Sequence, residues 1–236
     1  MALPFLNCQF KRLINGSDGE TGTDFATVNQ AGLLGWNSVP DTWTYASATT
    51  ITVPTDATTK YAVGDRLRLK QGGGYKYFYI VTVAATLLTV TGGSDYTVAN
   101  STITDVATSK FPNPLDFPGA FNWTPTLTGF SANPTNTVYR FSLVGRKCSI
   151  DVRQGTSGTS STTAFTISLP ITAVTLSNAA WTAAGQGVDN GGILPPAIMI
   201  SFSSGATVAN LYTNFAGAGW TAANGKSASF QMSYEI

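Results

Sequence analysis

The stretch Val138-Tyr-Arg-Phe-Ser-Leu-Val-Gly-Arg-Lys-Cys-Ser-Ile-Asp-Val-Arg153 decides the fold. Apolar and polar residues alternate on both sides of Gly145-Arg146, which is the period of a strand with one buried face. A glycine in first place suits a two-residue hairpin turn. Pairing Val144 with Lys147 places the apolar side chains of both strands on one face. A slip of one residue would mix the two faces, so we expect this register in the wall of a β-sandwich.

The same register predicts the surroundings of Asp151 and Cys148. It sets Arg140 opposite Asp151 on the polar face, and we interpret Asp151 as a cross-strand partner of Arg140. Cys148 falls on the apolar face and is predicted to be a small buried side chain. The only other cysteine is Cys8, and two cysteines are too few for a disulfide framework.

Alternation of the same kind continues to the end of the sequence, over residues 165–169, 198–202 and 230–236. About six to eight such strands predict an antiparallel β-sandwich of the jelly-roll type. We assign this C-terminal domain to residues 122–236. The prolines of residues 109–121 prevent strand pairing, and we interpret that segment as a linker.

Residues 36–108 contain short apolar runs separated by turn formers, which is typical of a small β-barrel-like domain. One predicted hairpin joins Arg66-Leu-Arg-Leu-Lys70 to Tyr75-Lys-Tyr-Phe-Tyr-Ile-Val-Thr-Val83 through a glycine-rich tip. The turn length decides whether the tyrosines or Phe78 and Ile80 join the two leucines in the core. The sequence leaves both registers open. The basic and aromatic residues of this hairpin also suit a nucleic-acid surface, but a small barrel needs such aromatics for its own core.

Residues 1–35 differ from the rest of the chain, and we interpret them as an extended N-terminal docking arm. Asp24 is a candidate cap for a short helix over residues 25–34. The acidic residues of the arm do not have the spacing of a calcium-binding loop, so we expect no metal site there. We find no signal-peptide pattern and no apolar run long enough to span a membrane.

Composition excludes several kinds of chemistry. The 236 residues include no histidine, which removes histidine-dependent nucleophiles, general bases and metal sites. Charged residues make up 11% of the chain, against about 25% in a typical soluble domain. A net charge of +1 argues against a nucleic-acid footprint and a polybasic membrane anchor. We therefore expect no catalytic, cofactor or metal site, and no enzymatic activity.

Four residues of the C-terminal domain remain as candidate contacts for a glycan or a protein partner. Trp181 and Trp220 lie in the same context, Trp-Thr-Ala-Ala, and a core position is the favoured interpretation for both. Asp189 and Asn190 lie in a predicted turn. If the domain binds a ligand through its loops, we expect these four residues to contact it.

Several motifs of the chain resemble those of tailed-bacteriophage virion proteins. They are Trp123-Thr-Pro125, Val144-Gly-Arg146 and Leu169-Pro170 in the C-terminal half, and Trp43-Thr-Tyr45, Val63-Gly-Asp65 and Tyr77-Phe-Tyr79 in the N-terminal half. Their order is similar to that of the paired β-domains of tail fibres and appendages, or of capsid decoration proteins.

The resemblance implies a virion structural protein assembled in the host cytoplasm. It implies a homotrimer, an N-terminal arm that docks to other virion proteins, and outward β-domains that bind a host-surface polysaccharide. The chain has no long fibrous repeat, so a capsid decoration protein, cement or head fibre, stays as the alternative to a tail, tip or baseplate component. A glycan-depolymerising enzyme is the minor alternative.

Overall fold

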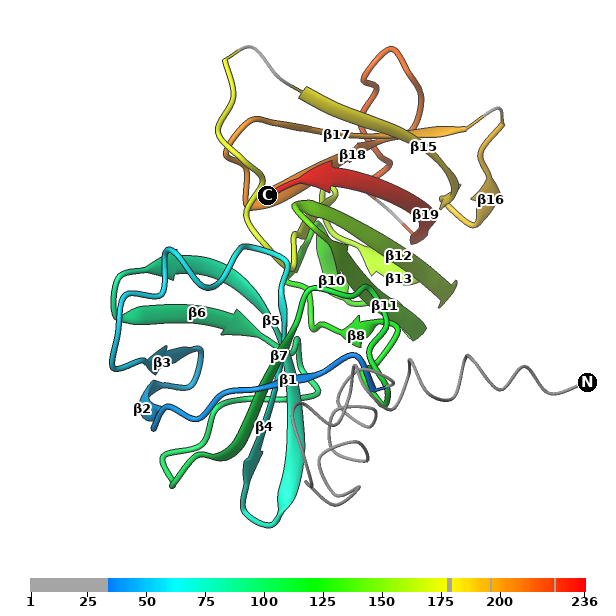
Figure 1. Ribbon diagram of the computed structural model, residues 1–236. Helices are drawn as coiled ribbons and strands as arrows, with labels where there is room; N and C mark the ends of the chain where they lie inside the picture. The colour runs from blue at the N-terminus through cyan, green and yellow to red at the C-terminus, as the bar shows by residue number, and fades with distance from the viewer. Residues whose placement is uncertain (1–33, 178–179, 196, 223) are drawn as a thin grey trace, which may run out of the picture.

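The computed structural model describes residues 34–177, 180–195, 197–222 and 224–236. Its strands form two antiparallel sheets, one for each half of the chain (Figure 1). The all-β prediction is therefore confirmed. The predicted docking arm and the helix over residues 25–34 lie almost wholly outside the described residues. Within the described ranges, no helix is long and apolar enough to cross a membrane.

The first sheet has seven strands in the order β1-β7-β4-β5-β6-β3-β2. Their bounds are β1 Asn37–Ser38, β2 Thr44–Ser47, β3 Thr50–Thr52, β4 Arg66–Gln71, β5 Gly74–Ala84, β6 Leu87–Thr91 and β7 Thr104–Ser109. The register left open by the sequence pairs Leu67 with Phe78 and Arg66 with Tyr79. Leu67 and Phe78 are buried in the core of this sheet. The tyrosines of β5 therefore share a face with the basic residues of β4.

The second sheet follows the order β8-β11-β12-β19-β15-β17-β18-β14-β9 and is strongly curled into a half-barrel around a second core (Figure 1). Three short strands, β10, β13 and β16, pair off this path. The bounds of the twelve strands are β8 Phe121–Asn122, β9 Leu127–Thr128, β10 Phe130–Ala132, β11 Thr135–Val144, β12 Lys147–Thr156, β13 Gly158–Ser160, β14 Thr166–Ser168, β15 Ala180–Asp189, β16 Gly192–Ile193, β17 Ile198–Ser203, β18 Val208–Tyr212 and β19 Gly225–Glu235.

The hairpin of β11 and β12 has the predicted register, with Val144 opposite Lys147. Gly145 adopts a φ of 57°, as a turn with glycine in first place requires. Cys148 is fully buried, which confirms its predicted core position.

The predicted partner of Asp151 is wrong. Asp151 does lie opposite Arg140 in the register, but its ion pair is with Arg153, at 3.2 Å from Nε to Oδ1. Arg153 lies two residues further along β12 on the same face, so its side chain reaches the carboxylate without crossing between strands.

An aromatic cluster joins the two sheets through the segment between them. Tyr79 of β5 packs edge-on against Phe117 at 5.1 Å and against Phe121 at 5.2 Å. Phe121 in turn lies 6.0 Å from Phe141 of β11. Phe117 belongs to the proline-rich segment, so that segment packs into the junction as well as connecting the sheets. We expect the two sheets to move as one body because burying these rings together stabilises their contact.

Candidate functional site

Trp220 is a core residue. Its side chain is 2% exposed, and its indole Nε1 donates a hydrogen bond of 2.8 Å to the carbonyl oxygen of Leu211. Phe165 packs edge-on against the ring at 5.1 Å. This agrees with the interpretation favoured by the sequence, and it leaves no surface of Trp220 for a ligand.

Asp189 and Asn190 hold a turn in place. The carboxylate of Asp189 accepts hydrogen bonds from the backbone N–H and the hydroxyl of Thr221, at 3.0 and 2.8 Å. The side-chain oxygen of Asn190 accepts one from the Asn224 amide at 2.7 Å. The structure thus brings Asp189, Asn190 and Trp220 to one end of the half-barrel, where their polar groups are engaged within the fold.

Trp181 lies at the other end of β15, roughly 26 Å from Asp189 at the rise of an extended strand. It therefore cannot share a small ligand with the other three candidates. Trp181 is half-buried and stacks on Phe202, with 5.4 Å between the ring centroids and 22° between the planes. Phe202 covers one side of the indole and fixes its orientation.

A hollow forms beside Trp181 because β15 separates from β19. The two strands pair only from Gly185 to Val188, and the part of β15 before Gly185 pairs with β17 alone. The hollow has a volume of about 410 Å³. Its lining includes Val144, Arg146, Lys147, Trp181, Ser233 and Glu235.

A second hollow, of about 550 Å³, adjoins the first and shares Ser233 with it. It covers the outer face of β11, β12 and β19, and its polar side chains are Arg140, Ser142, Ser149, Asp151, Gln231 and Ser233. We call the two hollows together the outer groove. Sequence reasoning identified this polar face on the hairpin but assigned it no function, since β12 and β19 meet only in the folded chain.

A third hollow, of about 850 Å³, lies between the two sheets. Threonine hydroxyls and aliphatic side chains from β5, β6 and the segment 170–174 line it. Arg146 is the only charged side chain among its lining residues. Its other titratable side chain is Tyr61, whose pKa burial raises above the ordinary value, so the hollow lacks an acid–base pair suited to neutral pH.

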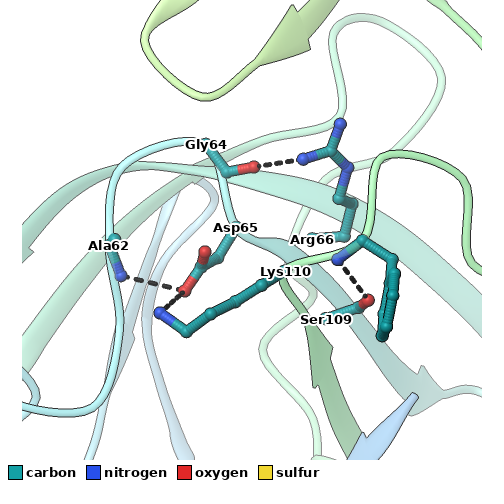
Figure 2. Close-up of polar contacts among 7 residues, drawn as sticks. Ala62, Gly64, Asp65, Arg66, Ser109 and Lys110 are labelled. Atoms are coloured by element: carbon teal, nitrogen blue, oxygen red, sulfur yellow. Dashed lines mark hydrogen bonds and ion pairs between the residues drawn. The ribbon is translucent and has the colours of Figure 1, made fainter. Parts of the chain in front are cut away.

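Asp65 and Arg66 are the buried charged side chains among the described residues of the first half, and they lie at the junction of the sheets (Figure 2). Asp65 accepts a hydrogen bond from the Ala62 N–H at 2.9 Å and pairs with Lys110 at 3.4 Å. The Arg66 guanidinium points away from Asp65, and its Nη1 donates to the carbonyl oxygen of Gly64 at 2.8 Å. Each of the two buried charges thus has partners of its own, so we assign them a structural role.

The burial of Arg66 also bears on the nucleic-acid alternative. Arg66 is 3% exposed, and its guanidinium lies 5.5 Å from the centre of the Tyr79 ring. Arg68, next on the same face, lies between the rings of Trp36 and Tyr75, at 5.0 and 4.7 Å. Two of the three cations that suggested a nucleic-acid surface are therefore taken up by aromatic packing within the chain.

Lys226 is a further buried cation. Its Nζ donates hydrogen bonds to the carbonyl oxygens of Thr162 and Ala164, at 2.9 and 2.7 Å. Phe130 and Phe165 place their rings 4.9 and 5.6 Å away. Burial lowers the pKa of Lys226 from its ordinary value. No pocket described above is lined by Lys226, so we assign it to the core.

In the parts of the chain that the structure describes, no three cysteine, aspartate or glutamate residues come close enough to hold a metal ion. The chain matches no family model, no curated protein and no solved structure.

Proposed function

We propose that the protein is an exterior, tail-associated structural component of a bacteriophage particle, and that its outer groove contacts a host-surface glycan. The observation that carries the proposal is the junction, where Arg66 and an aromatic cluster join two low-charge β-sheets into one body. A rigid body of this kind suits a protein that holds a binding surface at a fixed position on the outside of a particle.

The motifs that resemble virion proteins form the scaffold of this body. Trp123 is buried, packs on Tyr139 at 5.6 Å, and donates from Nε1 to the carbonyl oxygen of Ser168 at 3.3 Å. The Val144-Gly-Arg146 motif forms the turn of the central hairpin. The motif residues therefore support the proposed likeness to virion proteins through their place in the scaffold. The proposed glycan contact is the outer groove.

We also propose that the protein is a homotrimer. We expect size-exclusion chromatography with light scattering to give about three times the mass of the 24.7 kDa chain. A monomer at high concentration that also fails to bind phage particles would reject the proposal.

The position on the particle is tested by electron microscopy of the parent virion with a gold-labelled antibody against this protein. Label at the tail, tip or baseplate is the expected result. Label on the head would support the capsid decoration alternative, and unlabelled particles would reject both.

We propose no enzymatic role, since the two carboxylates of the outer groove, Asp151 and Glu235, are each engaged in an ion pair with an arginine. Incubation with host capsular or wall polysaccharide should release no new reducing ends. If the number of new reducing ends rose with the concentration of the protein, this part of the proposal would be overturned in favour of a depolymerase.

A further inference from the structure

We infer that the outer groove binds an acidic polysaccharide, with Trp181 as a stacking platform at one end and free cations along its length. The inference rests on the proposed function, and it goes further by naming the chemical class of the ligand and the residues that recognise it.

The groove is built from three rows of side chains that cross the strands in register. Arg140 of β11 lies opposite Asp151 of β12, which lies opposite Gln231 of β19. The next two rows are Ser142, Ser149 and Ser233, and then Val144, Lys147 and Glu235. Successive rows lie two residues apart along each strand, so the three rows together span roughly 13 Å. This length accommodates more than one sugar ring.

The charges along the groove favour an anion. Arg140 and Lys147 form no ion pair or side-chain hydrogen bond with the described residues, whereas Asp151 is paired with Arg153 and Glu235 with Arg146 at 3.6 Å. The acids are thus neutralised by neighbours while two cations stay free. A guanidinium and an ammonium group bind carboxylates through charge-assisted hydrogen bonds.

The middle row suits the hydroxyl groups of a sugar. Ser149 and Ser233 share a hydrogen bond of 2.8 Å between their hydroxyls, and both can exchange further bonds with a ligand. Their small side chains let a flat ring approach the sheet. At the end of the groove, Trp181 packs against the core with part of its side chain and lines the hollow with the rest, which gives an apolar surface for the C–H face of a ring.

Nucleic acid fits these residues less well. Single-stranded nucleic acid is held by several phosphate contacts together with several stacking aromatics. The outer groove has one aromatic platform and a floor of serines. An acidic peptide would use the free cations but not the indole surface, so it is kept as an outcome of the test.

The test is calorimetric titration of the full chain with a panel of acidic oligosaccharides: oligogalacturonate, alginate, hyaluronan and α2,8-linked sialic acid oligomers. Fully methyl-esterified oligogalacturonate has the same sugar without the charge and serves as the matched ligand. We expect binding to at least one acidic member, weakened at least about tenfold in the neutral counterpart and by added salt.

The variants identify the residues. Trp181→Ala should weaken binding about fivefold to tenfold, and the double variant Arg140→Gln/Lys147→Gln about tenfold or more. Phe215→Ala, an exposed aromatic in the loop before β19, and Lys76→Gln, in the first sheet, should bind as the parent does. If Trp181→Ala unfolds, the double variant on the exposed surface decides the result.

Three outcomes overturn the inference: no binding to any acidic member, equal binding to the methyl ester, or equal binding to poly-glutamate or a single-stranded oligonucleotide. The particle role is judged separately. Labelled virions without acidic-glycan binding would reject the groove alone, whereas acid-selective binding without labelled virions would reject the particle role alone.

Discussion

Nη2 of Arg66, in the first sheet, donates a hydrogen bond of 2.9 Å to the carbonyl oxygen of Leu143 in the second. The same guanidinium donates to Gly64 at 2.8 Å and, from Nε, to Pro112 at 3.1 Å. One buried side chain therefore bonds to both sheets and to the segment between them. The three carbonyl oxygens and the neighbouring Tyr79 ring together stabilise the buried positive charge.

Replacing Arg66 should destabilise the whole chain. Arg66→Met keeps much of the side-chain volume but leaves three carbonyl oxygens without their donors, at a cost of about 2–4 kcal/mol. The measurement is the free energy of unfolding from urea titration. Arg153→Met, which removes an exposed arginine, should change it by less than about 0.5 kcal/mol. Equal effects of the two variants would show that the junction does not depend on the buried hydrogen bonds.

The tip of the central hairpin packs against the first sheet at Gly64. This residue has a φ of 90°, and a Cβ added there would overlap the carbonyl oxygen of Gly145. Gly73 has a similar φ of 86° but has nothing within 4 Å of such a Cβ. A substitution at Gly73 therefore introduces backbone strain alone, whereas one at Gly64 introduces the same strain and also disrupts the contact between the sheets.

We expect Gly73→Ala to cost about 1–2 kcal/mol, the strain of a left-handed alanine. Gly64→Ala should cost at least about 3 kcal/mol, because the hairpin must also move away. Thermal unfolding of the two variants provides the comparison. Matching losses of stability would mean that the contact between Gly64 and Gly145 adjusts without cost.

Cys148 should be unreactive in the folded protein. Burial raises the pKa of its thiol to about 12, so almost no thiolate exists at pH 8. In a Cys8→Ser background, we expect a disulfide reagent such as DTNB to label the native chain only as fast as it unfolds. In strong denaturant one thiol per chain should react at once. Fast labelling of the native state would contradict the assignment of Cys148 to the core.

The sequence predicted one hairpin register and not the other, for a physical reason. In β11 and β12 one face is apolar and the other polar, so only one register separates them. In β4 and β5 both faces carry large side chains, and the tip has three glycines that permit several turns. The structure uses Gly72 and Gly73, both with positive φ, as a two-residue turn.

The candidate site shows the same limit. Trp181 and Trp220 are both followed by Thr-Ala-Ala, yet Trp220 is buried by Phe165 and Leu211 while Trp181 borders a hollow. Burial depends on strands far along the chain, which local patterns do not identify. The outer groove needs Ser149 and Ser233 side by side, and they are 84 residues apart.

Alkaline pH should unfold the protein through its buried tyrosines. The Tyr234 hydroxyl donates a hydrogen bond of 2.7 Å to the carbonyl oxygen of Ile171, and burial raises its pKa well above the ordinary value of 10.0. Burial also raises the pKa of Tyr79 and Tyr139. The stability from these groups is complete below pH 10, where both states keep the proton, and it falls as the pH rises towards the folded-state pKa.

Above pH 10 the unfolded chain releases the Tyr234 proton while the folded chain retains it, so the free energy of unfolding falls by about 1.4 kcal/mol per pH unit from this group. Tyr234→Phe should remove that part of the slope, and at pH 7 it should cost about 1 kcal/mol for the lost hydrogen bond. Tyr75→Phe, at an exposed ring, should keep the slope of the parent. Urea titrations between pH 8 and 11.5 measure both quantities. A Tyr234→Phe variant with the parent slope would place the alkaline sensitivity in other groups, because only a proton held more tightly in the folded state produces this dependence.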